Sequence, residues 1–163
     1  MSGQQTTLEN GFSVREAGSE DLEIVLRHRM SMFLDMGYRD REILKKVENE
    51  SRKFFTEHLS NGRYRGWFVE NANHEVIAGG GVVIHDYHPQ GIDPTLRRPV
   101  IVNMYTDPSC RRQGFARVLM NVMIEWCKKE GFGTVLLHAS NDGRPLYESL
   151  GFKPTNEMRL MLK

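Results

Sequence analysis

Apolar residues recur along much of this chain at every third or fourth position, which is the period of an amphipathic helix. Asp40 precedes the second of these stripes and is its expected N-terminal cap, and Gly62 follows it as a stop. A shorter helix is expected near the C-terminus. The apolar pattern therefore predicts four helices, with stripes or limits at residues 22–33, 43–59, 115–126 and 143–150.

Between the helices lie apolar and β-branched runs of the length of strands. The two runs at residues 64–70 and 75–86 are separated by only four polar residues, so we expect them to pair as a hairpin. Three consecutive glycines at residues 79–81 are followed by more strand and by no helix, which favours a bulged or closely packed strand over a phosphate loop. The remaining strands are expected at residues 12–17, 100–106, 134–140 and 158–162.

Strands interleaved with helices indicate an α/β fold. The hairpin is antiparallel, whereas the helix after residues 100–106 favours a parallel pair, so the predicted sheet is mixed and mostly antiparallel. We expect a single domain over residues 12–163 and a disordered polar tail over residues 1–11. Residues 87–99 contain three prolines and no periodicity; both a lid on the substrate side and a surface excursion are consistent with that pattern.

The most informative stretch runs from the strand at residues 100–106 into the third helix. Asp107 and Pro108 break the strand, and a basic loop with Gly114 leads into the helix. The start of a helix presents unpaired N–H groups and a partial positive charge, so it can hold an anion such as a pyrophosphate. Arg111, Gly114 and Ala116 resemble the R/Q-x-x-G-x-G/A signature of the GNAT N-acetyltransferases.

A second motif strengthens the resemblance. Residues 144–152, R-P-L-Y-E-S-L-G-F, are similar to the L-Y-x-x-x-G-F segment of the same family in type, order and spacing. The resemblance implies a GNAT-like α/β sandwich whose central strands splay apart, and a cofactor, acetyl-CoA, that donates its acetyl group to an amine. It implies cofactor contacts at Met104, Tyr105, Thr106, Arg111, Arg112, Gln113, Gly114, Phe115, Ala116 and Arg117, with Ser140 or Asn141 as a further contact or a plain helix cap.

The resemblance also implies catalytic roles. Tyr147 matches the family's general acid, and a phenol with a pKa of about 10 is protonated at neutral pH. Where many members have a glutamate base on the central strand, this chain has Asn103, which cannot accept a proton. Four side chains are therefore candidates for the general base: His138, His85, Asp86 and His88. We rank His138 first because its strand lines the splay.

The first two helices and their link are expected to wall the acceptor site, by the same resemblance. Residues 36–38 would then lie near the acceptor. A second stripe on the first helix, with His28, Met32 and Asp35, is interpreted as a partly solvated face.

The amino-acid composition limits the classes of partner that we expect for this chain. The chain has 22 basic and 21 acidic residues and a formal charge of +1, so nothing suggests nucleic acid or an anionic membrane surface. No run approaches the roughly 20 apolar residues that span a bilayer, and a cytoplasmic location is expected. Cys110 and Cys127 are too few for a metal site. We expect a small-molecule amine substrate and allow for a homodimer; a protein or peptide amine, or a CoA-binding sensor without turnover, are the alternatives.

Overall fold

The computed structural model describes residues 6–162 and contains one six-stranded sheet in the order β1-β2-β3-β4-β5-β6. The strands are β1 (Thr6–Thr7), β2 (Ser13–Glu16), β3 (Tyr64–Glu70), β4 (Val76–Asp86), β5 (Arg97–Thr106) and β6 (Leu136–Leu137). The α-helices are α1 (Leu22–Asp35), α2 (Arg41–Ser60), α3 (Phe115–Lys129) and α4 (Arg144–Ser149). Three 3₁₀ turns, η1 (Glu9–Gly11), η2 (Ser19–Asp21) and η3 (Pro108–Cys110), join them.

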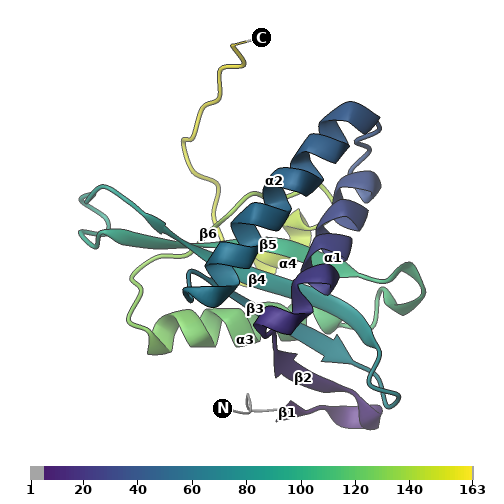
Figure 1. Ribbon diagram of the computed structural model, residues 1–163. Helices are drawn as coiled ribbons and strands as arrows, with labels where there is room; N and C mark the ends of the chain where they lie inside the picture. The colour runs from purple at the N-terminus through teal and green to yellow at the C-terminus, as the bar shows by residue number, and fades with distance from the viewer. Residues whose placement is uncertain (1–5, 163) are drawn as a thin grey trace.

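The predicted fold class is confirmed. Every neighbouring pair of strands is antiparallel except β5 and β6, which are parallel and joined through α3. Helices α1 and α2 lie together across one face of the sheet, and α3 crosses the other face (Figure 1). As predicted, Asp40 caps α2, with its carboxylate accepting from the amides of Glu42 and Ile43.

The N-terminal strand corrects part of the predicted tail. Thr6 and Thr7 pair with Val14 and Ser13, so regular structure extends into the stretch that was expected to be disordered. The edge of β2 is the reason, because its backbone groups need partners and the polar segment supplies them. Residues 1–5 of the predicted tail lie outside the described residues.

The last strands also differ from the expectation. Of the strand predicted at residues 134–140, only Leu136 and Leu137 form a ladder, and the strand predicted at residues 158–162 is not formed. A strand exists only where a neighbouring backbone completes its hydrogen bonds, and no strand within residues 6–162 lies beside this segment. It extends away from the body (Figure 1), leaving Met158 95% and Leu162 87% exposed.

The three glycines of β4 allow close packing on both faces of the sheet, as predicted. A Cβ at Gly79 would come within 2.7 Å of the His28 ring on α1. At Gly80 it would overlap Met104, and at Gly81 the Tyr64 ring. Larger residues at these positions would push the neighbouring side chains away from β4.

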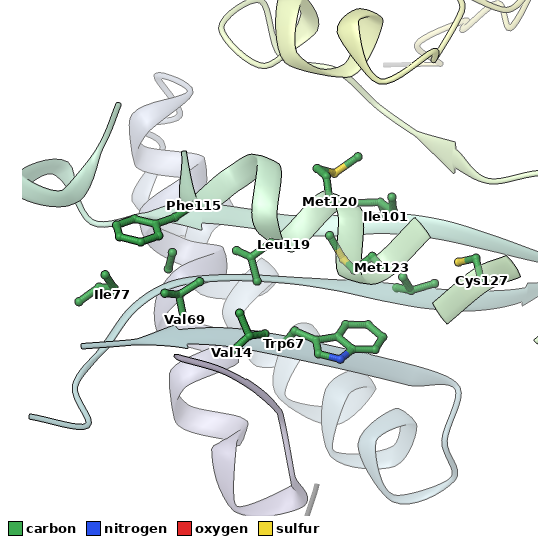
Figure 2. Close-up of a cluster of buried hydrophobic side chains, with 12 residues drawn as sticks. Val14, Trp67, Val69, Ile77, Ile101, Phe115, Leu119, Met120, Met123 and Cys127 are labelled. Carbon is green, nitrogen blue, oxygen red and sulfur yellow. The ribbon is translucent and has the colours of Figure 1, made fainter. Parts of the chain in front are cut away.

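The core between α3 and the sheet is apolar. Figure 2 shows Phe115, Leu119, Met120, Met123 and Cys127 of α3 over strand residues such as Trp67 and Ile101. The opposite face has a second apolar cluster beneath α1 and α2, but buried polar side chains lie beside it. The sheet therefore has one dry face and one polar face.

Candidate functional site

A bulge in β5 is the centre of the candidate site. Gly79 pairs with Tyr105 and Gly81 with Val102, so two residues of β5, Asn103 and Met104, face only Gly80. Asn103 adopts a left-handed conformation with φ of 59°, which asparagine tolerates better than most residues. The bulge changes the direction of the strand at the point where the sequence predicted cofactor contacts.

On its other side β5 loses its neighbour at the same point. Its pairing with β6 consists of Val100 with Leu136 and Ile101 with Leu137. Within the described chain, no strand pairs with this edge of β5 beyond Ile101. The predicted splay is therefore present, and Met104, Tyr105 and Thr106 lie on an edge that can accept an extended ligand as an added strand.

The loop after β5 has the backbone shape of an anion site. Arg112 has a φ of 64° and Gly114 a φ of 87°, two left-handed residues on either side of Gln113. Such alternation turns successive N–H groups toward a common point, and α3 begins directly afterwards at Phe115. A Cβ at Gly114 would meet no heavy atom within 4 Å, so the space beside it is open. These features fit a pyrophosphate.

The arginine side chains of this loop are partly engaged elsewhere. Arg111 donates through Nε to the Thr106 carbonyl at 2.9 Å and forms an ion pair with Asp35 of α1. Arg117 donates to the Ser149 hydroxyl of α4 at 2.8 Å. The side chain of Arg111 thus fastens the loop to β5 and α1, which leaves the backbone amides as the predicted anion contacts.

Tyr147 lies on α4 and packs against the same apolar cluster as Met104. Its ring meets Phe152 edge to face at 6.2 Å between centroids. Burial raises the pKa of Tyr147 above its ordinary value, so the phenol is protonated at neutral pH. The structure thus places it on the α3 side of the splayed strands, and its role as general acid stays a prediction.

Ser140 and His138 lie near β6, and neither contacts the polar face. The hydroxyl of Ser140 accepts a hydrogen bond from the amide of Gly143 at 3.2 Å, in the turn before α4, and its contact with the cofactor stays a prediction. Asn141 beside it is exposed. His138 is exposed, with its Nε2 3.5 Å from a carboxylate oxygen of Glu157. The catalytic role of His138 stays a prediction.

A pocket of about 630 Å³ opens on the polar face between α2 and the strands β4 and β5. Val102, the residue before the bulge, lies in its wall. The other residues that line it are Arg29, Val47, Glu50, Ser51, Lys53, Phe54, Phe55, Glu57, Val83 and His85. This pocket lies where the first two helices were expected to wall an acceptor, although Met36 and Tyr38 are exposed outside it.

Residues 87–96 contribute nothing to the wall of that pocket. The connection is instead fastened at its base by Asp93, which is buried and forms an ion pair with Arg98. Asp93 also accepts a hydrogen bond from Thr134 at 2.7 Å, beside β6. The arrangement fits a surface excursion better than a lid over this pocket.

A partly buried polar network connects the pocket with the bulge. The guanidinium of Arg29 donates to the Ser51 hydroxyl at 3.0 Å and to the side-chain oxygen Oδ1 of Asn103 at 2.9 Å. Tyr64 is buried nearby, and burial raises its pKa to about 12. Sequence reasoning placed Arg29 in the apolar stripe of α1 and gave it no role. A permanently charged residue at a core position of a helix was the available signal.

His28 is a correction to the predicted solvated stripe. It is buried against Phe68 and Tyr105, with ring centroids 5.7 and 4.9 Å away, because Gly79 leaves room for the imidazole. Neither ring nitrogen has a hydrogen-bond partner among the described residues. Burial, together with the charge of Arg27, lowers the pKa of His28 to about 4, so the ring is neutral.

Among the four candidate bases, only His85 lines the pocket. Asp86 is held in an ion pair by Arg63, and His88 stacks on Tyr87. Burial, followed by the charges of His58 and Arg63, lowers the pKa of His85, so it can accept a proton only weakly at neutral pH. It lies four residues along β4 from Gly81, or about 14 Å from the bulge at 3.4 Å per residue.

Neither a metal site nor a membrane span is found. No group of three His, Cys, Asp or Glu side chains within residues 6–162 is arranged to hold a metal ion. In the same range, each helix is too short or too polar to cross a bilayer.

Comparison with known proteins gives one family. The model of the acetyltransferase (GNAT) family matches residues 30–152. Among human proteins, N-acetyltransferase 8 is 33% identical over 70 residues, a match that spans 40% of this chain and 31% of that protein. N-acetyltransferase 8B is 36% identical over a match of the same extent. The chain thus matches about a third of the length of these relatives.

Solved structures are similar over nearly the whole chain. A GCN5-related N-acetyltransferase from Ralstonia eutropha JMP134 is 34% identical with a TM-score of 0.88, and the match covers 93% of this chain and 99% of that one. A predicted acetyltransferase from Clostridium acetobutylicum, solved with acetyl-CoA, is 27% identical with a TM-score of 0.84, over 92% of this chain and 95% of that one.

Proposed function

We propose that this chain, which belongs to the acetyltransferase (GNAT) family, transfers an acetyl group from acetyl-CoA to the primary amine of a small molecule. One observation carries the proposal. The bulge at Asn103 and Met104 lies between an unpaired strand edge on one side and the 630 Å³ pocket on the other. A thioester donor along the strand edge and an amine acceptor in the pocket can therefore both approach the backbone near the bulge.

The family uses acetyl-CoA, whose thioester supplies an activated acetyl group. The edge of β5 at Met104, Tyr105 and Thr106 would hold the pantetheine arm through backbone hydrogen bonds. The amides between Arg112 and Arg117 would hold the pyrophosphate. An amide at Met104 or Tyr105 would also stabilise negative charge on the carbonyl oxygen, an effect typically of about 3 kcal/mol.

Transfer then needs proton movements at two atoms. The amine nitrogen forms a bond to the carbonyl carbon while the carbon–sulfur bond breaks and the electron pair leaves on sulfur. Tyr147 donates its phenolic proton to that sulfur, because its raised pKa keeps the proton in place until negative charge develops. The proton lost by the amine leaves through the pocket to solvent and balances the one that Tyr147 regains. His85 at the pocket wall and His138 at β6 stay predictions for that route.

The size and charge of the pocket support a small acceptor. A volume of about 630 Å³ is typical of sites for small molecules. Its charged residues are Arg29 and Lys53 against Glu50 and Glu57, which balance. A peptide that bound through several residues would need an extended groove, and the described pocket is confined to α1, α2, β4 and β5. The cytoplasmic location and the homodimer stay predictions.

Calorimetric titration with acetyl-CoA, followed by measurement of free thiol in the presence of amines, tests the proposal. Replacing Gly114 by Ala should weaken acetyl-CoA binding about tenfold, because a Cβ strains the left-handed backbone of the anion loop. Gly131→Ala is the matched control. Gly131 has a φ of 78° and equally open surroundings at the other end of α3, so this variant should lose similar stability and keep its affinity. Absence of acetyl-CoA binding to the wild-type protein would refute the proposal.

A further inference from the structure

Arg29, which is half-buried, differs from the buried Arg98 in what neutralises it. Arg98 is buried in an ion pair with Asp93. The guanidinium of Arg29 instead lies over the rings of Phe33 and Phe55, at 4.9 and 5.5 Å from their centroids, and donates to Ser51 and Asn103. Both acceptors are neutral. Among the side chains that the structure describes, no carboxylate oxygen lies within 4.0 Å of Arg29.

An arginine keeps its proton even when buried, so the pocket retains this positive charge. A charge removed from water without a counter-ion is costly, and proteins normally pair it. The two acidic residues of the pocket do not pair it, because both are exposed on the outer part of α2 and Glu50 already binds Lys53 at 2.7 Å. The cation at the inner end of the pocket is therefore unpaired by the protein.

The remaining donors of Arg29 define the ligand. A guanidinium has five N–H groups. Nε and Nη1 each donate one hydrogen bond here, which leaves one N–H on Nη1 and two on Nη2. This is the edge that a carboxylate binds with two parallel hydrogen bonds. A singly charged carboxylate neutralises the guanidinium of Arg29, whereas a phosphate dianion would carry one negative charge that Arg29 does not neutralise.

We propose that Arg29 is the carboxylate-binding residue of the acceptor pocket, so that the acceptor carries a carboxylate a few bonds from its reacting amine, as amino acids do. This inference rests on the proposed function, since it specifies the amine. The contact of Nη1 with Asn103 places the guanidinium beside the bulge where the acetyl group would lie. A carboxylate bound there holds the amine close to the acetyl carbon, and an acceptor with both groups is electrically neutral in a pocket whose charges balance.

The experiment compares acceptors that differ only in this group. For several side chains, the α-amino acid, its primary amide and the decarboxylated amine are assayed for thiol release with acetyl-CoA, beside an amine that carries a phosphate monoester. We expect kcat/KM for the acid to exceed that for the matched amine about 100-fold, as for a charge-assisted bidentate contact. Arg29→Gln should reduce this ratio to about threefold, and Arg29→Lys should retain about a tenfold preference.

Arg27→Gln is the matched control, because it removes the same charge from an exposed position of the same helix. It should leave the ratio unchanged. Calorimetric binding of N-acetyl amino acids, with their uncharged N-acetyl amines as reference, gives a second readout that does not depend on turnover. If Arg29→Gln does not fold, as judged by circular dichroism, the Lys variant and this binding measurement decide the question.

The outcomes separate the two proposals. Acetylation of acids and amines at equal rates, or preference for the phosphate ester, would overturn the role of Arg29 and leave acetyl transfer intact. Acetyl-CoA binding without turnover, together with N-acetyl acids that bind no better than the uncharged products, would overturn it as well. Failure to bind acetyl-CoA would instead refute the proposed function itself.

Discussion

The two faces of the sheet differ in what they bury. Beneath α3 the buried cluster is apolar throughout and rich in sulfur, with Met120, Met123 and Cys127. On the face covered by α1 and α2, the side chains of His28, Arg29 and Asn103 have polar groups that are partly or wholly removed from water. The first arrangement is favourable throughout, whereas the second combines an apolar cluster with polar groups that are costly to remove from water. The face under α1 and α2 therefore carries the polar groups that a ligand could pair.

The largest expected effect is on the dry face. Replacing Leu119 by Ala removes a fully buried side chain from the α3 cluster and should lower the free energy of unfolding by about 3 kcal/mol. Urea denaturation measures the change, and Asn121→Ala on the exposed side of the same helix is the control. The kcat of the folded protein should change less than about twofold. A large loss of kcat would show that the two faces are not separate.

Tyr147 is an exception to the division between the two faces, because it packs with the α3 cluster and has a catalytic role in the proposed mechanism. Tyr147→Phe should reduce kcat about 100-fold, since the departing sulfur loses its proton donor, while the affinity for acetyl-CoA is unchanged. Steady-state kinetics and calorimetry measure the two quantities. Tyr87→Phe, in the loop away from the pocket, should have wild-type kcat. Full turnover of the Tyr147 variant at neutral pH would remove the general-acid role.

His28, on the polar face of the sheet, should make the free energy of unfolding depend on pH. Its folded pKa of about 4 is below the ordinary 6.5, so between these values the folded state binds fewer protons than the unfolded chain. The stability linked to a neutral His28 is complete above pH 6.5 and is lost as the pH falls toward 4. Between pH 7.5 and 5 the loss should be about 2 kcal/mol in urea denaturation.

Two variants isolate the contribution of His28. His28→Leu should lose this component of the pH dependence, whereas the exposed His88→Leu should retain it. An unchanged pH dependence in the His28 variant would mean that the pKa of His28 is the same in the folded protein as in the unfolded chain.

The smallest effect is expected at the C-terminus. Deleting the chain from residue 158 onward removes side chains such as Met158 and Leu162 that are almost fully exposed and belong to no strand. The free energy of unfolding should change by less than about 0.5 kcal/mol. A loss above about 1 kcal/mol in urea denaturation would show that this segment packs against the protein in solution.

Sequence reasoning predicted the elements whose pattern is local. The α2 cap at Asp40 and the closely packed glycine strand follow from short-range spacing and residue type. The missing strand at residues 158–162 depends on whether another backbone lies alongside, which period alone does not determine.

The features of the candidate site also divide into those with a local cause in the sequence and those that depend on distant contacts. The anion loop is a local backbone shape and was predicted, with Gly114 in place. The burial of His28 depends on the absence of a side chain at Gly79, about fifty residues away, and the role of Arg29 depends on Ser51 and Asn103. Such contacts join distant parts of the chain and carry no sequence period.

The three glycines of β4 also set how this protein can change over generations. A substitution at Gly79 displaces a helix, one at Gly80 disturbs the strand edge next to the cofactor, and one at Gly81 disturbs Tyr64 under the acceptor network. A side chain encoded at any of these three adjacent codons therefore requires a neighbour to shift, and the neighbour differs from one codon to the next. The exposed pocket residues of α2, such as Lys53 and Glu57, have no such constraint. Lineages of this chain can therefore reshape the pocket by mutations in one helix while the edge of β5 stays the same.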